Sequence, residues 1–564
     1  MKRYTEHIGN TPFDVIVIGG GISGAAIAYE SATRGLLVAL FEKGDFSEAT
    51  SAASSKLIHG GLRYLANMEY GLVRESLRER RTLENIAPNF VYPCPFLFPH
   101  YQSPLKSNKW LMKAGLTLYD LLAFDKHRTW DAAKIISAHT TLTSDEALKR
   151  QPVLKRKGLS GASIFYDCLN IFPERLTLAF IKSAMTHHAE VANYARVGGF
   201  LFDNTGKTVQ GVTVKDLIHD TTHEVRGTVT LNCAGPWVDS VLAMARREGS
   251  DPLLRRSEGV HIITKPLIND TTAISAITPN GRHCFLIPWR GHTLIGTTDK
   301  AYHGDPDDYR VTRQSIEELI AEVNVTFDGL AIKYEDILHC YGGLRPLVEN
   351  QTEETYTTSR KYEIHDNAAD GLSGLMTVEG GKWTTSRHLA EKVIDHLQGK
   401  AALPISRSVS EQKYLKGSEI RDMDAFINRI KHENTDFDAD TVAYLGRVYG
   451  TEFADVLALA RQTPALAQRL NDDGEILAQA VYAARNEMVL TLKDIVLRRT
   501  GLASLGNPGD DILRCVALAV AVTSAGTMPG CDRKWKRRRH FYKFQWIDVH
   551  CGRTVPMMSK ENSI

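Results

Sequence analysis

Residues 13–24 have the sequence FDVIVIGGGISG, and this stretch decides the fold of the N-terminal region. The apolar run over residues 13–18 predicts a strand that is buried on both faces. The small residues that follow from Ile22 predict a helix, and the apolar run over residues 36–41 predicts a second buried strand. Two parallel strands joined by a crossover helix form a βαβ unit, so we expect an α/β fold.

Three glycines lie at the junction of the first strand and the helix. Gly19, Gly21 and Gly24 form the pattern GxGxxG. The first permits the tight turn, the second lets a pyrophosphate approach the backbone, and the third lets the helix pack closely on the strand. Glu42 ends the second strand and can accept hydrogen bonds from ribose hydroxyls, which argues against a 2′-phosphate. The pattern predicts a dinucleotide site but does not separate FAD from NAD.

Length and composition exclude several classes of protein. The 564 residues suffice for two or three packed units, and 43% hydrophobic with 24% charged residues is ordinary for a globular protein. A formal net charge of +2 gives no reason to expect a nucleic-acid partner. The eight cysteines show no CxxC spacing, which predicts free thiols in a reducing compartment and no metal site. Neither a signal peptide nor a membrane-spanning run of ~20 apolar residues is predicted.

The rest of the chain divides by its hydrophobic pattern. Residues 70–86 have helical periodicity, and the proline-rich residues 88–99 end that helix. Residues 190–235 alternate as a β-meander does. Residues 405–525 return to helical periodicity, which predicts a separate α-helical domain. Further strands are predicted at residues 261–264, 283–289 and 292–299.

Four motifs follow one another along the chain: ASSKLIHGGLRY at residues 53–64, NCAGPW at 232–237, GTTD at 296–299 and GGKWTT at 380–385. With these motifs the sequence resembles the FAD-dependent glycerol-3-phosphate dehydrogenases, closely over residues 12–400 and more loosely to about residue 520. The resemblance implies that FAD is the cofactor and that sn-glycerol 3-phosphate is oxidised to dihydroxyacetone phosphate. It also implies a quinone as electron acceptor; the alternative is an oxidase that uses O2 and releases H2O2.

The resemblance also implies the domain organisation. We expect a Rossmann-like, glutathione-reductase-like FAD domain with an interleaved antiparallel β-rich substrate domain, followed by a C-terminal α-helical domain. The oxidoreductase region is expected over residues 12–400 and the helical domain over 405–526; beyond about residue 526 the chain departs from the family, and we expect a basic, poorly ordered tail over 527–564. The expected FAD-binding segments are about 12–90, 165–240 and 340–400, and the expected substrate segments are about 91–164 and 241–339.

A phosphorylated alcohol requires cations in its site, because Arg and Lys bind a phosphate dianion through charge-assisted hydrogen bonds. Each candidate cation, taken alone, is better explained as a surface residue. Taken together, and with Gly-Gly pairs beside them, they favour a binding site. The resemblance places these side chains at the substrate: Arg63, Tyr64, Arg345, Arg360 and Lys382.

Oxidation of the alcohol also requires a base that takes the hydroxyl proton. His261 occupies the position at which relatives carry a histidine near the substrate, and an imidazole titrates in the useful range. We therefore expect His261 and Arg345 to be the catalytic residues. Three alternatives stay open: His261 is a core histidine satisfied by backbone groups, the base is His59, or the base is an activated Arg345.

The other motif residues are assigned to the cofactor. Small side chains and free N–H groups suit a close approach to the diphosphate and the flavin. The predicted cofactor-binding residues are Gly19, Gly21, Gly24, Glu42, Ser54, Ser55, Lys56, His59, Gly60, Ala234, Gly235, Thr298, Gly381, Lys382 and Thr384.

The charge pattern bears on where the protein works. Residues 105–119 combine Lys, Trp and Leu at helical spacing, which is typical of an interfacial helix and equally of a helix packed on its own core. The basic residues 533–539 fit anionic lipid or nucleic acid, and a poorly ordered solvated tail explains them better. We expect a cytoplasmic protein, peripheral on the inner face of the membrane if residues 105–119 are interfacial. A homodimer is left open.

Overall fold

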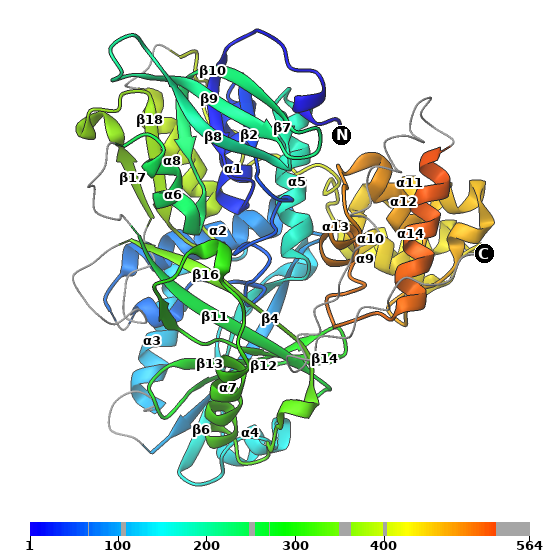
Figure 1. The fold of residues 1–564 in the computed structure, drawn as a ribbon. Helices are drawn as coiled ribbons and strands as arrows, with labels where there is room; N and C mark the ends of the chain where they lie inside the picture. Colours follow the sequence, from blue (N-terminus) through cyan, green and yellow to red (C-terminus); the bar gives the residue numbers. More distant parts are fainter. Residues whose placement is uncertain are drawn as a thin grey trace.

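The structure is a computed structural model and describes residues 1–65, 67–102, 109–246, 254–269, 271–348, 362–398 and 403–525. These residues form two sheets with helices packed on them, and a separate group of C-terminal helices (Figure 1). The first sheet contains the predicted βαβ unit: β1 (Phe13–Ile18) and β2 (Val38–Phe41) pair in parallel, and α1 (Ile22–Thr33) connects them. Because β1 has a parallel strand on each edge, Val15, Ile16 and Val17 are fully buried.

The first sheet has the strand order β17-β18-β10-β1-β2-β7, and β9 joins β10 to β8. The predicted meander within residues 190–235 is confirmed, since β8, β9 and β10 pair in succession as antiparallel strands, whereas β7 pairs in parallel with β2. The further strands of this sheet are β7 (Glu190–Ala192), β8 (Ala195–Phe202), β9 (Val209–Asp216), β10 (Thr221–Asn232), β17 (Tyr362–Asp366) and β18 (Leu375–Gly380).

The second sheet has the order β15-β11-β14-β13-β12-β4-β6-β3, with β16 on β11 and β5 on β6. Strands were predicted at residues 261–264, 283–289 and 292–299; all three are present, although the last ends at Gly296. The strands are β3 (Leu57–Ile58), β4 (Val91–Tyr101), β5 (Thr140–Leu142), β6 (Leu159–Asn170), β11 (Leu254–Thr264), β12 (Ala273–Ile277), β13 (His283–Trp289), β14 (His292–Gly296), β15 (Lys300–Tyr302) and β16 (Ile337–Val348).

The proline-rich residues 88–99 predicted only the end of a helix, but most of them form β4. Pro93, Pro95 and Pro99 stand at positions of the same parity, so their missing N–H groups fall on one edge of the strand. β6 pairs with β4 along its whole length, whereas β12 joins it only at Phe96 and Leu97. Prolines are tolerated in β4 because its edge toward β12 has few ladder hydrogen bonds to lose. A sequence pattern cannot reveal which edge of a strand is sparsely paired.

Helices cover the sheets. The predicted helix over residues 70–86 is α2 (Tyr70–Ile86), and α1 packs between α5 and α8. The other helices of this region are α3 (Lys109–Leu122), α4 (Ser144–Arg150), α5 (Pro173–Thr186), α6 (Val238–Ala243), α7 (Arg313–Thr326) and α8 (Ser386–Gln398). Within the described ranges no helix is long and apolar enough to span a membrane.

The C-terminal helices form the predicted helical domain, which Figure 1 shows beside α5. Its apolar core is continuous with that around α1 and α5. Arg175 of α5 also donates to both carboxylate oxygens of Glu487, at 2.9 and 3.1 Å. The helices are α9 (Met423–Glu433), α10 (Ala439–Tyr449), α11 (Phe453–Gln462), α12 (Ala478–Asn486), α13 (Leu492–Asp494) and α14 (Asp510–Ala525). The basic tail predicted over residues 527–564 lies outside the described residues.

Candidate active site

One cavity of about 1240 Å³ is lined by both sheets and extends from the glycine turn after β1 to β11 and β16. Segments that are far apart in the chain therefore meet at one site. Arg360 lies outside the described residues. Of the residues predicted from the sequence, the cavity is lined by Gly19, Gly21, Glu42, Ser54, Ser55, Lys56, His59, Arg63, Tyr64, Ala234, Gly235, His261, Arg345, Gly381 and Lys382.

The glycine turn gives α1 no side-chain cap of its own, although the N–H of Ile22 donates to Ser51 Oγ. Gly21 is the N-cap of α1 and has no side chain to cap it, and the first turn contains no acidic residue. Gly19 has a φ of +110°, and a Cβ there would lie 2.5 Å from the carbonyl oxygen of Cys233. A Cβ on Gly24 would lie 1.9 Å from the Gly19 oxygen, so Gly24 supports the turn without lining the cavity. Free N–H groups at a helix N-terminus bind a phosphate, so this end of the cavity fits a diphosphate.

Glu42 is held at the end of β2 by the backbone. Its two carboxylate oxygens accept hydrogen bonds from the N–H groups of Gly20 and Gly44, each at 2.7 Å. Burial raises the pKa of Glu42 above its usual value. Each oxygen keeps a further lone pair, and a ribose hydroxyl can donate to it.

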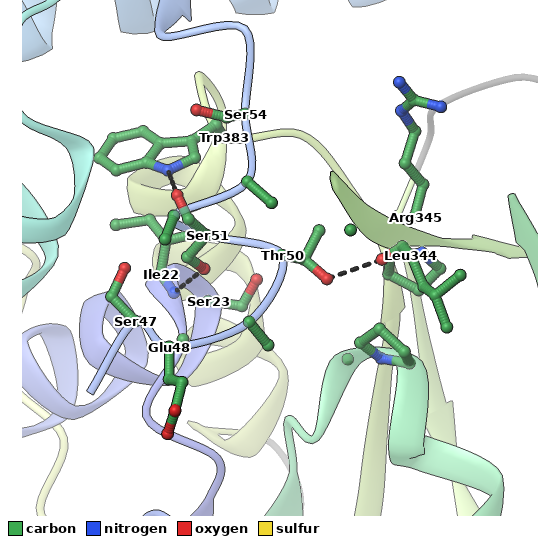
Figure 2. Close-up of a pocket in the computed structure, with 18 of the residues that line it drawn as sticks. Ile22, Ser23, Ser47, Glu48, Thr50, Ser51, Ser54, Leu344, Arg345 and Trp383 are labelled. Carbon is green, nitrogen blue, oxygen red and sulfur yellow. Dashed lines mark hydrogen bonds between the residues drawn. The ribbon is translucent and has the colours of Figure 1, made fainter. Parts of the chain in front are cut away.

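A serine-rich segment, residues 47–55, connects the parts of the cavity (Figure 2). Ser51 Oγ accepts from the N–H of Ile22 at 2.9 Å, and the Ser51 carbonyl accepts from Trp383 Nε1 at 3.2 Å. Thr50 Oγ1 donates to the carbonyl of Leu344 in β16 at 2.6 Å. We did not predict Thr50, Ser51 or Trp383 as site residues. The serine-rich composition directly after the βαβ unit was the only signal for the first two.

Two cations and one aromatic ring form a wall of the cavity. Arg63 Nη2 donates to the Tyr64 hydroxyl at 3.1 Å, and Lys382 Nζ lies 4.7 Å from the centre of the Tyr64 ring. Burial, opposed by Glu75 and reinforced by Arg63, lowers the pKa of Lys382 to about 7. A half-buried pair of like charges favours an anionic ligand, so this wall, called the cationic wall below, fits a phosphate.

His261 lines the same cavity as the cationic wall, is buried and is hydrogen-bonded to Ser55. Its Nε2 lies 2.8 Å from Ser55 Oγ, and its ring stacks on Tyr341 with the centroids 5.1 Å apart. A Cβ on Gly296 would lie 2.2 Å from His261 Cδ2, so only glycine leaves room for the imidazole. Burial and the charges of Arg345 and Lys56 lower the pKa of His261 well below its usual value. The imidazole is therefore neutral, and its Nδ1 has no hydrogen-bond partner among the described residues.

Arg345 is held by the protein itself. Its Nη1 donates to the carbonyls of Glu258 and Thr298, at 3.1 and 3.0 Å, and its Nη2 donates to Thr297 Oγ1 at 2.6 Å. A Cβ on Gly259 would lie 2.1 Å from its Nη2. The guanidinium group is fixed in place, and most of its donors are already used.

The turn that contains His59 is held in place by hydrogen bonds from its backbone N–H groups. The N–H of Gly60 donates to Asp167 Oδ1 at 3.0 Å, and the N–H of His59 donates to Thr384 Oγ1 at 3.1 Å. Neither Gly60, Thr384 nor Thr298 lines the cavity. Burial and the nearby charges of Lys382, Arg63 and Arg80 lower the pKa of His59 to about 3.

The described residues hold no cluster of His, Cys, Asp or Glu that could bind a metal ion. The described cysteines are free, and all are buried except the half-buried Cys515. The cavity itself brings together a glycine turn that fits a diphosphate, a cationic wall and a neutral histidine.

Two known families match most of the chain. The family described as "FAD dependent oxidoreductase" matches residues 14–387, and the one described as "C-terminal domain of alpha-glycerophosphate oxidase" matches residues 408–524. A glycerol-3-phosphate dehydrogenase of Synechocystis sp. is 32% identical over 98% of this chain and 100% of its own length. Glycerol-3-phosphate dehydrogenase 2 of Mycobacterium bovis is 34% identical over 94% of this chain and 88% of its own.

Among solved structures, the glycerol-3-phosphate dehydrogenase from Bacillus halodurans complexed with FAD is 28% identical. It matches with a TM-score of 0.73 over 95% of both chains.

Proposed function

The chain belongs to the FAD-dependent glycerol-3-phosphate dehydrogenases, and on this basis we propose that it oxidises sn-glycerol 3-phosphate to dihydroxyacetone phosphate and passes the electrons to a quinone. The observation that carries the proposal is the cationic wall, because Arg63 and Lys382 line the same cavity as His261 and the glycine turn. When bound, FAD supplies the acceptor for the hydride that leaves C2 of the substrate.

We assign the substrate phosphate to the cationic wall. Arg63 and Lys382 both contact Tyr64, and all three side chains line the cavity. A phosphate dianion would receive charge-assisted hydrogen bonds from both cations and would offset their mutual repulsion. Binding the phosphate here leaves the rest of the substrate to extend toward His261.

We assign the hydroxyl proton to the pair of His261 and Ser55. The imidazole is neutral, which is the state that a proton acceptor requires, and Ser55 fixes the orientation of its Nε2. Both side chains line the cavity, so a hydroxyl group can approach them. Arg345 is less suited, since its guanidinium donates to backbone carbonyls and stays protonated in proteins.

The surface of α3 supports a quinone as the acceptor. Leu116 and Tyr119 are buried under the helix, whereas Trp110, Leu111 and Leu121 are 73%, 60% and 66% exposed. An amphipathic helix with apolar side chains in solvent is typical of a protein that rests on a lipid surface. We therefore propose a peripheral position on the inner face of the membrane, where a lipid-soluble quinone is within reach.

Anaerobic mixing with glycerol 3-phosphate tests the reaction. We expect the flavin absorbance to bleach, and the bleached enzyme to be reoxidised by a quinone such as menadione much faster than by O2. A flavin that stays oxidised with glycerol 3-phosphate would contradict the substrate. Fast reoxidation by O2, with one H2O2 formed per turnover, would instead favour the oxidase. The description of the family that matches residues 408–524 names such an oxidase.

A further inference from the structure

The C-terminal helical domain reaches the cofactor cavity. Lys493, Leu497 and Arg498 line the cavity together with Glu42 and Glu48. The three residues come from α13 and the π-helical turn Ile495–Arg499 that follows it. Turns of this kind occur often at functional sites. A domain outside the oxidoreductase region therefore contributes side chains to its cavity.

Asp45 anchors this contact. It lies three residues after Glu42 and is fully buried. Arg499 donates to both of its carboxylate oxygens at 2.8 Å, and Arg498 Nε donates to Oδ2 at 2.7 Å. Although burial opposes ionisation, the two guanidinium groups hold the pKa of Asp45 below its usual range. The loop after β2 is thus joined to the helical domain by buried charge-assisted hydrogen bonds.

Lys493 continues the contact to the cavity wall. Its Nζ donates to Glu48 Oε1 at 2.8 Å, and Glu48 Oε2 accepts from the N–H of Asp45 at 3.0 Å. The Lys493 side chain is 47% exposed, so its ammonium group can also meet an anion. The neighbouring Ser47 donates its N–H to the carbonyl of Gly20 at 3.0 Å, which places this segment against the glycine turn.

We propose that the C-terminal domain retains FAD, with Lys493 and Leu497 forming part of the site for its nucleotide half. The chemistry of the ligand fits these side chains, because an adenosine offers an apolar surface to Leu497 and a diphosphate offers negative charge to Lys493. Lys493, at 2.8 Å, and Arg498, at 3.9 Å, together offset the charge of Glu48, and the loss of Lys493 would increase the repulsion between this carboxylate and the diphosphate. The proposal rests on FAD binding and not on the substrate, base or electron acceptor.

Flavin retention by the full-length holoenzyme tests the proposal. Leu497→Ala and Lys493→Met should each raise the Kd for FAD about fivefold to tenfold, measured as flavin that passes a centrifugal filter after dilution. Adding Glu48→Gln to Lys493→Met should restore much of the affinity, since the carboxylate, which then has only Arg498 as a nearby cation at 3.9 Å among the described side chains, is gone. Leu459→Ala is the matched control: it is a half-buried leucine of the same core outside the cavity, and its Kd should stay unchanged.

Circular dichroism establishes that each variant is folded. Lys493→Met concerns an exposed side chain and should fold normally, which keeps the proposal testable if Leu497→Ala does not fold. Wild-type affinity in Lys493→Met, or an equal loss in Leu459→Ala, would overturn the proposal. The predicted changes in Kd, found in a protein that glycerol 3-phosphate does not reduce, would support FAD retention and contradict the proposed substrate.

Discussion

Lys382 should make substrate affinity depend on pH. Burial, only partly offset by Glu75, lowers its pKa to about 7 in the free enzyme, so its charge is lost as the pH rises through that value. A bound phosphate dianion favours the charged form, and the pKa in the complex is therefore higher than in the free enzyme. At a pH between these two pKa values, substrate binding is therefore accompanied by protonation of Lys382. The affinity is thus full below about pH 7 and falls above it by up to tenfold per pH unit.

The contact of Lys382 with the phosphate sets the size of the effect. A hydrogen bond to a charged group contributes roughly 1.5–3 kcal/mol, so Lys382→Met should lower kcat/KM about 10-fold to 150-fold. Most of the loss should appear in KM, because Arg63 and Tyr64 still form the cationic wall. Lys382→Arg keeps its charge at every pH and should lose less affinity.

Stopped-flow bleaching of the flavin under anaerobic conditions, followed from pH 6 to 9, measures these quantities. The wild-type enzyme should show an alkaline fall in kcat/KM near pH 7, and both Lys382 variants should lack it. FAD content serves as the control, since a loss of cofactor would mimic a loss of affinity. An alkaline fall that persists unchanged in Lys382→Met would refute the reasoning and assign the titration to another group.

Three other perturbations probe the remaining parts of the site. Gly21→Val should yield protein without flavin, because a side chain there blocks the approach of the diphosphate to α1; normal flavin absorbance after purification would contradict this. His261→Ala should slow bleaching by roughly 100-fold, and Ser55→Ala by less, with FAD still bound. Because the pKa of His261 lies well below its usual value, the rate of the wild-type enzyme should not fall through protonation of His261 between about pH 5 and 8. A fall in rate at acid pH that disappears in His261→Ala would contradict the lowered pKa. Trp110→Ser should reduce co-sedimentation with anionic vesicles, whereas Val325→Ser, which removes an exposed apolar residue from α7, should not; equal effects would count against α3 as the contact.

The buried strands, the glycine turn and the helical domain could be predicted because their signals are local. A run of apolar residues is enough to bury a strand such as β1, and the requirement for glycine at position 24 arises from the carbonyl oxygen of Gly19 in the same turn. The resemblance carried by the four motifs implied FAD and a phosphorylated substrate, which residue types and spacing by themselves did not specify.

The contacts that each site residue makes, and with them its role, were decided by the tertiary structure. Ser55 was assigned to the cofactor, but its Oγ lies 2.8 Å from the Nε2 of a histidine 206 positions away. Asp45 is joined to Arg499 across 454 positions, and no local pattern indicates that the helical domain meets the cavity. Such contacts depend on the register of β11 against β14 and β16 and on how the domain packs on α5. Neighbouring residues determine an element and its turns, whereas the partner of a side chain is set by which distant elements the whole core brings together.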